Sequence, residues 1–145
     1  MAVKVCLDAG HYGKYNRSSA VSSYYESDMT WKLHNYLKQE LEAFGIGVVT
    51  TRTNQNTDRA LYERGAASKG CNLFISVHSN AVGNGVNENV DYPVAYVLLN
   101  GSSTDIGLKL AKVVEAVMGT AQSGRTAHVR GQTENTMGCF VVRMQ

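Results

Sequence analysis

The sequence lacks the features that mark several classes of protein. Proline is nearly absent, with Pro93 alone among 145 residues, and the chain shows no repeat and no linker. Lys and Arg outnumber Asp and Glu by only 14 to 12, and the charges are scattered, which argues against a nucleic-acid-binding protein. The uncharged apolar runs, such as residues 72–77, are far too short to span a bilayer. Hydrophobic (43%) and charged (18%) contents near globular averages exclude disorder and a coiled coil, so we expect one globular domain.

Cysteine is also scarce, and its pattern argues against a disulfide framework. The three cysteines are odd in number and show no CxxC spacing. Cys6 and Cys139 lie inside apolar runs and Cys71 precedes one, so we expect free, buried thiols. Met1 leads almost directly into an apolar stretch and not into a signal peptide. We therefore expect synthesis and folding in the cytoplasm, or a domain cut from a longer secreted chain.

Hydrophobic periodicity predicts alternating strands and helices. Apolar residues recur at three- and four-residue steps after Glu26, which predicts a helix over residues 26–44 that stops at Gly45. A second helix, capped by Thr57 or Asp58, is predicted to run to about Lys69, and a third around residues 106–117. Residues 124–138 are polar and show no period. The predicted strands are residues 3–7, 48–51, 73–78, 94–99 and 139–142.

This order predicts an α/β fold, a three-layer α/β/α sandwich around a mostly parallel, mixed sheet. The sequence ends just after its last predicted strand, whereas such a sheet usually ends with a covering helix. We therefore expect residues 1–145 to form a single domain that lacks its C-terminal strand and helix.

Two histidines are predicted at the edge of the sheet where α/β proteins bind ligands. His11 follows the first strand and His78 ends the third, while Glu26 opens the first helix. Because neighbouring strands lie about 4.8 Å apart, these side chains can converge. Two imidazoles and one carboxylate suit a catalytic zinc ion that keeps its fourth position for water.

Each of these residues also has a structural interpretation. A histidine at a strand end is commonly a hydrogen-bonded loop residue, and Glu26 fits a capping box that begins at Ser23. The spacing of the three residues is not a motif by itself. His34 within the helix and His128 in the aperiodic segment are predicted to be surface residues.

The segments around these residues resemble the zinc-dependent N-acetylmuramoyl-L-alanine amidases. The order and spacing of the blocks resemble that family over roughly residues 3–143. The matching blocks are residues 5–11 (VCLDAGH), Glu26 before an amphipathic helix, residues 47–52 (GVVTTR), residues 61–64 (LYER) and residues 72–81 (NLFISVHSNA). Arg52 and Arg64 belong to these blocks, and we interpret both as structural residues.

The resemblance implies that His11, Glu26 and His78 bind one zinc ion. It also implies hydrolysis of the amide between the lactyl group of N-acetylmuramic acid and L-alanine in peptidoglycan. The family's general-base glutamate follows an Arg-containing segment that residues 140–143 resemble, so we expect it beyond Gln145. Glu134 and Glu88 are not assigned that role.

Three further residues are candidates for substrate contact. The family usually continues with small residues after the first histidine, whereas this chain has Tyr12 and Tyr15. These tyrosines either line a saccharide or peptide groove or are ordinary loop residues. Asn80 either hydrogen-bonds the substrate's peptide or holds the loop after His78 through an Asx-type turn.

Two other functions compete with a peptidoglycan amidase. A non-catalytic, zinc-containing peptidoglycan-binding module is the main alternative, because no general base is visible. A nucleotide-binding domain requires a glycine-rich loop after the first strand, and residues 8–13 have too few glycines at the needed offsets. For the amidase we expect a monomer that acts at the bacterial cell wall, without nucleic acid or membrane insertion. A phage lysin and the catalytic domain of an autolysin or sporulation hydrolase remain open.

Overall fold

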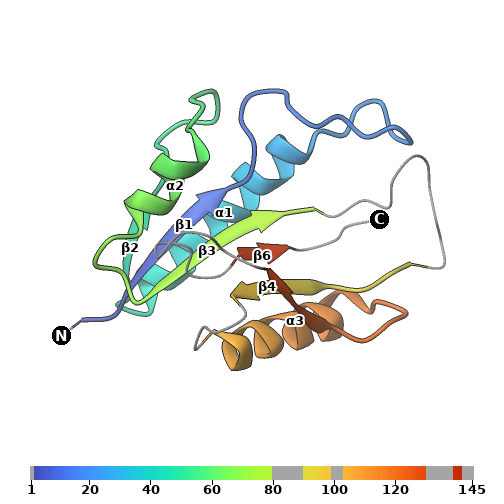
Figure 1. The fold of residues 1–145 in the computed structure, drawn as a ribbon. Helices are drawn as coiled ribbons and strands as arrows, with labels where there is room; N and C mark the ends of the chain where they lie inside the picture. Colours follow the sequence, from blue (N-terminus) through green and yellow to red (C-terminus); the bar gives the residue numbers. More distant parts are fainter. Residues whose placement is uncertain (1, 80–89, 99–102, 130–138, 142–145) are drawn as a thin grey trace.

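The chain folds into a six-stranded sheet with helices on both faces (Figure 1). The structure is a computed structural model that describes residues 2–79, 90–98, 103–129 and 139–141. The strands lie in the order β2-β1-β3-β6-β4-β5, and every neighbouring pair is parallel except β4 with β6. The elements, in chain order, are β1 (Lys4–Ala9), α1 (Glu26–Ala43), β2 (Gly47–Thr50), α2 (Leu61–Ala67), β3 (Leu73–His78), β4 (Val94–Leu98), α3 (Thr104–Met118), β5 (Arg125–Val129) and β6 (Cys139–Val141).

Helices α1 and α3 cover the same face of the sheet. Leu33 of α1 and Leu110 of α3 both pack against a small buried cluster formed by Ala95 of β4 and Ala111 of α3, and Ile75 of β3 joins them. Gly107 brings α3 close to β4, because a Cβ at this position would lie 2.8 Å from a Val97 methyl carbon. The apolar stripes that predicted these helices therefore face one shared core.

Helix α2 covers the opposite face. Successive side chains of a strand point to opposite sides of its sheet, so Ser76 points away from the core that Ile75 enters. The Ser76 hydroxyl donates to Asp8 Oδ2, and Asp8 also pairs with Arg64 of α2. The predicted mixed, three-layer α/β/α sandwich is thus confirmed.

The ends of several elements differ from the sequence-based prediction. Helix α2 begins at Leu61 and not at Thr57 or Asp58, because the Asn54 side chain accepts the N–H groups of Asn56 and Thr57 and holds this segment in a turn. Strand β5 was not predicted. It lies within the aperiodic residues 124–138, and its short, polar sequence RTAHV forms a strand because it pairs with β4 at the sheet edge. The other strands differ from their predicted bounds by two residues or fewer, and the ends predicted at residues 99 and 142 lie outside the described residues.

Two positions of α1 also differ from expectation. His34, predicted at the surface, is buried with 2% exposure, because its ring stacks on Trp31 where the helix meets the sheet. Phe44, predicted to extend the apolar stripe, is exposed because the helix has already ended and Gly45 turns the chain with φ +74°. Within the described ranges, no helix combines the length and apolar character needed to cross a bilayer.

Candidate metal centre

Three side chains from separate elements meet at the C-terminal edge of the parallel strands. Strands β1 and β3 are neighbours with Ala9 opposite Val77, so His11 just after β1 lies beside His78 at the end of β3. Glu26 is the first residue of α1 and completes the group at the same edge of the sheet. One ligand atom from each of these three residues lies within 4.8 Å of the others. The structure therefore brings together all three predicted ligands.

The carboxylate of Glu26 lies between the two imidazoles. Its Oε2 is 3.2 Å from His11 Nε2, and its Oε1 is 3.1 Å from His78 Nδ1. The two histidine rings meet edge to face with centroids 5.1 Å apart. The Glu26 side chain is 4% exposed, whereas the histidine side chains are 25% and 29% exposed. The site is consequently closed on the carboxylate side and open on the imidazole side.

Contacts behind Glu26 fix its orientation. Oε1 accepts the Ser79 N–H at 2.7 Å, and Oε2 accepts the side-chain amide of Asn16. Burial alone raises the pKa of Glu26, but hydrogen bonds and charge interactions with His11 and His78 outweigh it and lower the pKa to about 2. The capping-box interpretation of Glu26 is wrong, because Tyr25 is the N-cap and makes no side-chain cap bond.

The backbone before His11 is shaped to admit the ring of His78. A Cβ on Gly10 would lie 2.4 Å from His78 Cε1, closer than real side-chain contacts allow. The Gly10 N–H donates to the Val77 carbonyl at 2.9 Å, and the Thr30 hydroxyl donates to the Gly10 carbonyl at 2.7 Å. His11 itself has φ +58°, a left-handed conformation that turns the chain out of β1. Residues 10 and 11 thus place both imidazoles together.

Two buried arginines hold this turn from below. Arg52 donates to the Ala9 carbonyl through Nε at 3.3 Å and Nη2 at 3.1 Å. Arg64 donates from Nη1 to the same carbonyl at 2.9 Å and from Nη2 to the His11 carbonyl at 3.3 Å. This agrees with the structural role predicted for both arginines, since their guanidinium groups satisfy carbonyls at the end of β1.

Asp8 is the residue that sequence reasoning missed. It is 2% exposed, and its carboxylate accepts bonds from Thr51 Oγ1 at 2.6 Å, Ser76 Oγ at 2.6 Å and Arg64 Nη1 at 2.9 Å. The carboxylate therefore joins the ends of three strands and α2 directly beneath the site. An aspartate inside an apolar strand was the available signal, because a buried charge requires partners.

The remaining predicted residues divide into three groups. His128 is exposed, as predicted. Tyr12 and Tyr15 lie beside His11 in a stack of rings. The predictions for Asn80, Glu88 and Glu134 lie outside the described residues.

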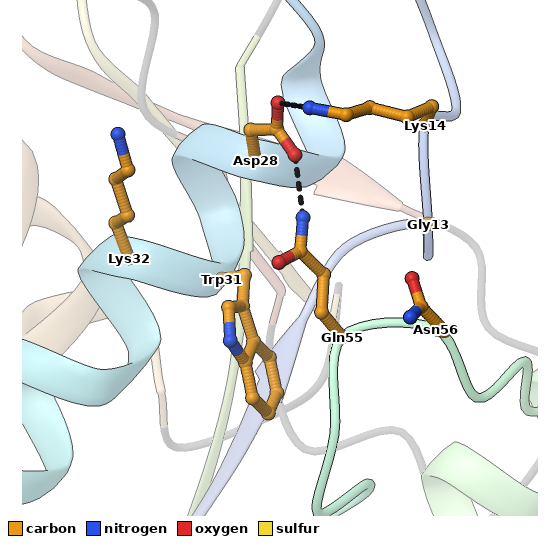
Figure 2. Close-up of a pocket in the computed structure, with 7 residues that line it drawn as sticks. All are labelled: Gly13, Lys14, Asp28, Trp31, Lys32, Gln55 and Asn56. Carbon is orange, nitrogen blue, oxygen red and sulfur yellow. Dashed lines mark hydrogen bonds and ion pairs between the residues drawn. The ribbon is translucent and has the colours of Figure 1, made fainter.

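A cavity of about 460 Å³ lies beside α1 (Figure 2). Figure 2 shows Lys14 and Gln55 both reaching Asp28, which pairs with Lys14 Nζ and accepts the Gln55 amide. Asp28 is two residues after Glu26, so the two carboxylates point about 200° apart around the helix. The cavity is therefore distinct from the three-ligand site. The residues that line it are Gly13, Lys14, Asp28, Trp31, Lys32, Gln55 and Asn56.

Comparison with known proteins agrees with the site. A family model described as N-acetylmuramoyl-L-alanine amidase matches residues 5–143. The chain belongs to this family. A comparison with curated proteins found no match.

Solved amidase structures share the fold. An N-acetylmuramoyl-L-alanine amidase from Clostridium difficile 630 aligns with a TM-score of 0.78 and 20% identity, over 98% of this chain and 78% of that one. The amidase AmiC2 of Nostoc punctiforme gives 0.78 and 21% identity, over 97% and 78%. The catalytic domain of CwlV from Bacillus (Paenibacillus) polymyxa var. colistinus gives 0.70 and 22% identity, over 97% and 79%.

The donor set of this amidase-family chain fits a zinc ion. Tetrahedral zinc holds imidazole nitrogens and carboxylate oxygens at about 2.0–2.2 Å, which places neighbouring donors roughly 3.3–3.6 Å apart. The separations of 3.1 and 3.2 Å between Glu26 and the two histidines lie close to this range. Ser79 and Asn16 supply the outer hydrogen bonds that commonly orient a ligating carboxylate.

Proposed function

We propose that this chain hydrolyses the amide between the lactyl group of N-acetylmuramic acid and L-alanine in peptidoglycan, with one zinc ion held by His11, Glu26 and His78. The observation that carries the proposal is the convergence of these three side chains, within 4.8 Å, in a chain of the amidase family. We further propose that the protein acts at the bacterial cell wall, where this substrate lies.

The three residues would divide the work of holding the metal. Glu26 offers a negative oxygen, because a carboxylate with a pKa of about 2 is ionised throughout the neutral range. His11 and His78 bind as neutral imidazoles, each through one ring nitrogen. A zinc ion bound there supplies a Lewis acid for the scissile carbonyl and lowers the pKa of its water to about 7.

Access to the site suits a polymeric substrate. The buried carboxylate closes the floor, while the two partly exposed imidazoles face outward. A carbonyl on a long glycan strand can therefore approach from solvent without the strand entering the protein. Amide hydrolysis also requires a group that protonates the departing nitrogen, which typically contributes 10²–10⁴-fold to the rate. The described metal-ligand group holds a single carboxylate, Glu26, and the glutamate expected beyond Gln145 remains a prediction.

The test is release of new amino groups from purified cell-wall sacculi by the zinc-loaded chain. We expect slow release by the unaltered chain, because the glutamate that would protonate the departing nitrogen is expected beyond Gln145. We expect loss of release in His78→Ala and the same slow release in His128→Ala, which alters an exposed histidine. Folding of each variant is checked by circular dichroism. Sacculi that bind the zinc-loaded chain but release no amine would contradict hydrolysis and identify a binding module instead.

A further inference from the structure

We propose that Tyr15 and Tyr12 form a glycan-binding platform beside the metal centre, on which a pyranose ring of the substrate packs. This inference rests on the proposed function, because it assigns the sugar side of the same substrate.

The platform is a stack of three aromatic rings that begins at a metal ligand. The rings of His11 and Tyr15 have centroids 5.7 Å apart and an interplanar angle of 22°. Tyr15 and Tyr12 follow at 5.4 Å and 20°. Tyr15 is therefore the partner shared by both other rings, one of which belongs to a proposed metal ligand.

Tyr15 keeps a large free surface despite these two partners. It is 54% exposed, whereas Tyr12 is half-buried. The part of the Tyr15 ring that its two stacked neighbours leave uncovered is a surface on which the C–H groups of a sugar ring can pack while its hydroxyls stay in water. Tyr15 is thus the principal contact in the proposal and Tyr12 its support.

The backbone holds the platform in place before any ligand arrives. The Tyr15 N–H donates to Ser27 Oγ at 3.0 Å, and the Ser27 hydroxyl donates to the Gly13 carbonyl at 2.8 Å. The carbonyl of Asn16, the residue after Tyr15, accepts the Glu26 N–H at 3.0 Å. These bonds join the tyrosine loop to the first residues of α1, and a surface fixed in advance loses less entropy when it binds.

The chemistry of the substrate requires a sugar near this position. Only the lactyl ether separates the scissile carbonyl from the pyranose ring of N-acetylmuramic acid. When the carbonyl lies at the metal, that ring must lie within about one ring diameter of the site. Tyr15 is separated from the metal ligand His11 by one stacking distance, so the platform and the sugar fall at the same range.

The experiment measures ligand binding to the zinc-loaded chain by NMR titration, with two probes that separate the halves of the substrate. One probe is the β-1,4-linked tetrasaccharide of N-acetylglucosamine, which carries no peptide, and the other is the dipeptide L-Ala–D-Glu. We expect Tyr15→Ala to weaken tetrasaccharide binding about tenfold and to leave dipeptide binding within about twofold. Tyr15→Trp, which keeps an aromatic surface, should restore sugar binding.

Tyr62→Ala is the control, because Tyr62 is also an exposed tyrosine and lies on α2. It should change neither titration. The zinc content of every variant is measured, since Tyr15 also touches His11. Loss of zinc in Tyr15→Ala with unchanged sugar affinity would mean that Tyr15 only supports the ligand, and it would overturn the proposal. Equal weakening of both probes would also overturn it.

The two claims fail separately. Failure of the unaltered chain to release amines from sacculi contradicts the proposed amidase activity. The tetrasaccharide titration still tests the platform in that case. Tetrasaccharide binding that ignores Tyr15→Ala contradicts the platform, whatever the result with sacculi.

Discussion

Gly10 lies so close to the ring of His78 that a Cβ at residue 10 would be 2.4 Å from Cε1 and 2.6 Å from Nδ1. The glycine belongs to the turn that carries one proposed ligand, and the imidazole is another. The main chain just after β1 therefore limits where the ring of His78 can lie, and the packing of residue 10 is part of the proposed metal site.

The first prediction follows from this contact. Gly10→Ala forces the His78 ring away from Glu26, so we expect zinc affinity to fall about 10- to 100-fold while the chain remains folded. Gly47→Ala is the control, because a Cβ there meets the flexible Lys4 side chain at 3.3 Å and the Val3 carbonyl oxygen at 3.6 Å, an ordinary van der Waals contact. Competition titration against a chromophoric chelator measures both. Unchanged affinity in Gly10→Ala would show that His78 is not a ligand or that the site adapts freely.

The second prediction concerns the buried pair beneath the site. Arg64→Leu leaves the carboxylate of Asp8 buried without its cation, which typically costs about 3–5 kcal/mol. Urea unfolding should show a loss of this size in the free energy of unfolding. Lys112→Ala removes an exposed pair with Glu115 and should cost less than about 1 kcal/mol. Similar losses in the two variants would contradict the role assigned to Asp8.

The third prediction is that Cys6 stays unreactive in the native protein. Burial, with smaller contributions from Cys71 and Asp8, raises the pKa of the Cys6 thiol to about 12, so at pH 8.5 it carries almost no thiolate. Cys71 is only half-buried, which corrects the burial expected for it and predicts earlier labelling. Timed alkylation with peptide mapping separates the sites. Labelling of native Cys6 as fast as Cys71 is the contrary result.

The fourth prediction is a pH effect from His34. Burial lowers its pKa in the folded state, and Nε2 has no hydrogen-bond partner in the described structure. The unfolded chain therefore binds the proton more readily, so the free energy of unfolding should fall as the pH drops below about 6.5. His34→Phe should lose less stability between pH 7 and pH 5 than the unaltered chain. His128→Phe, at an exposed site, should keep the original slope.

Much of the site could be predicted because its residues stand at boundaries that the sequence marks. His11 and His78 follow strands with continuous apolar runs, and Glu26 stands where the helical period begins. These signals are local. The burial of His34 was not predictable in this way, because it depends on Trp31 and on the sheet that α1 covers.

Long-range pairing explains the other differences. Strand β5 has a weakly apolar sequence and exists because β4 offers it a partner, which no local pattern encodes. The burial of Asp8 likewise depends on hydrogen bonds from Thr51, Ser76 and Arg64, each more than forty residues away along the chain. The late start of α2 reflects a competing turn around Asn54.

The most direct test of the metal site is an anomalous difference map recorded at the zinc absorption edge from crystals grown with one equivalent of zinc. We predict a single strong peak within about 2.0–2.2 Å of one atom each from His11, Glu26 and His78. A peak bound by other residues, or none at these three while the protein holds zinc in solution, would contradict the proposed metal centre.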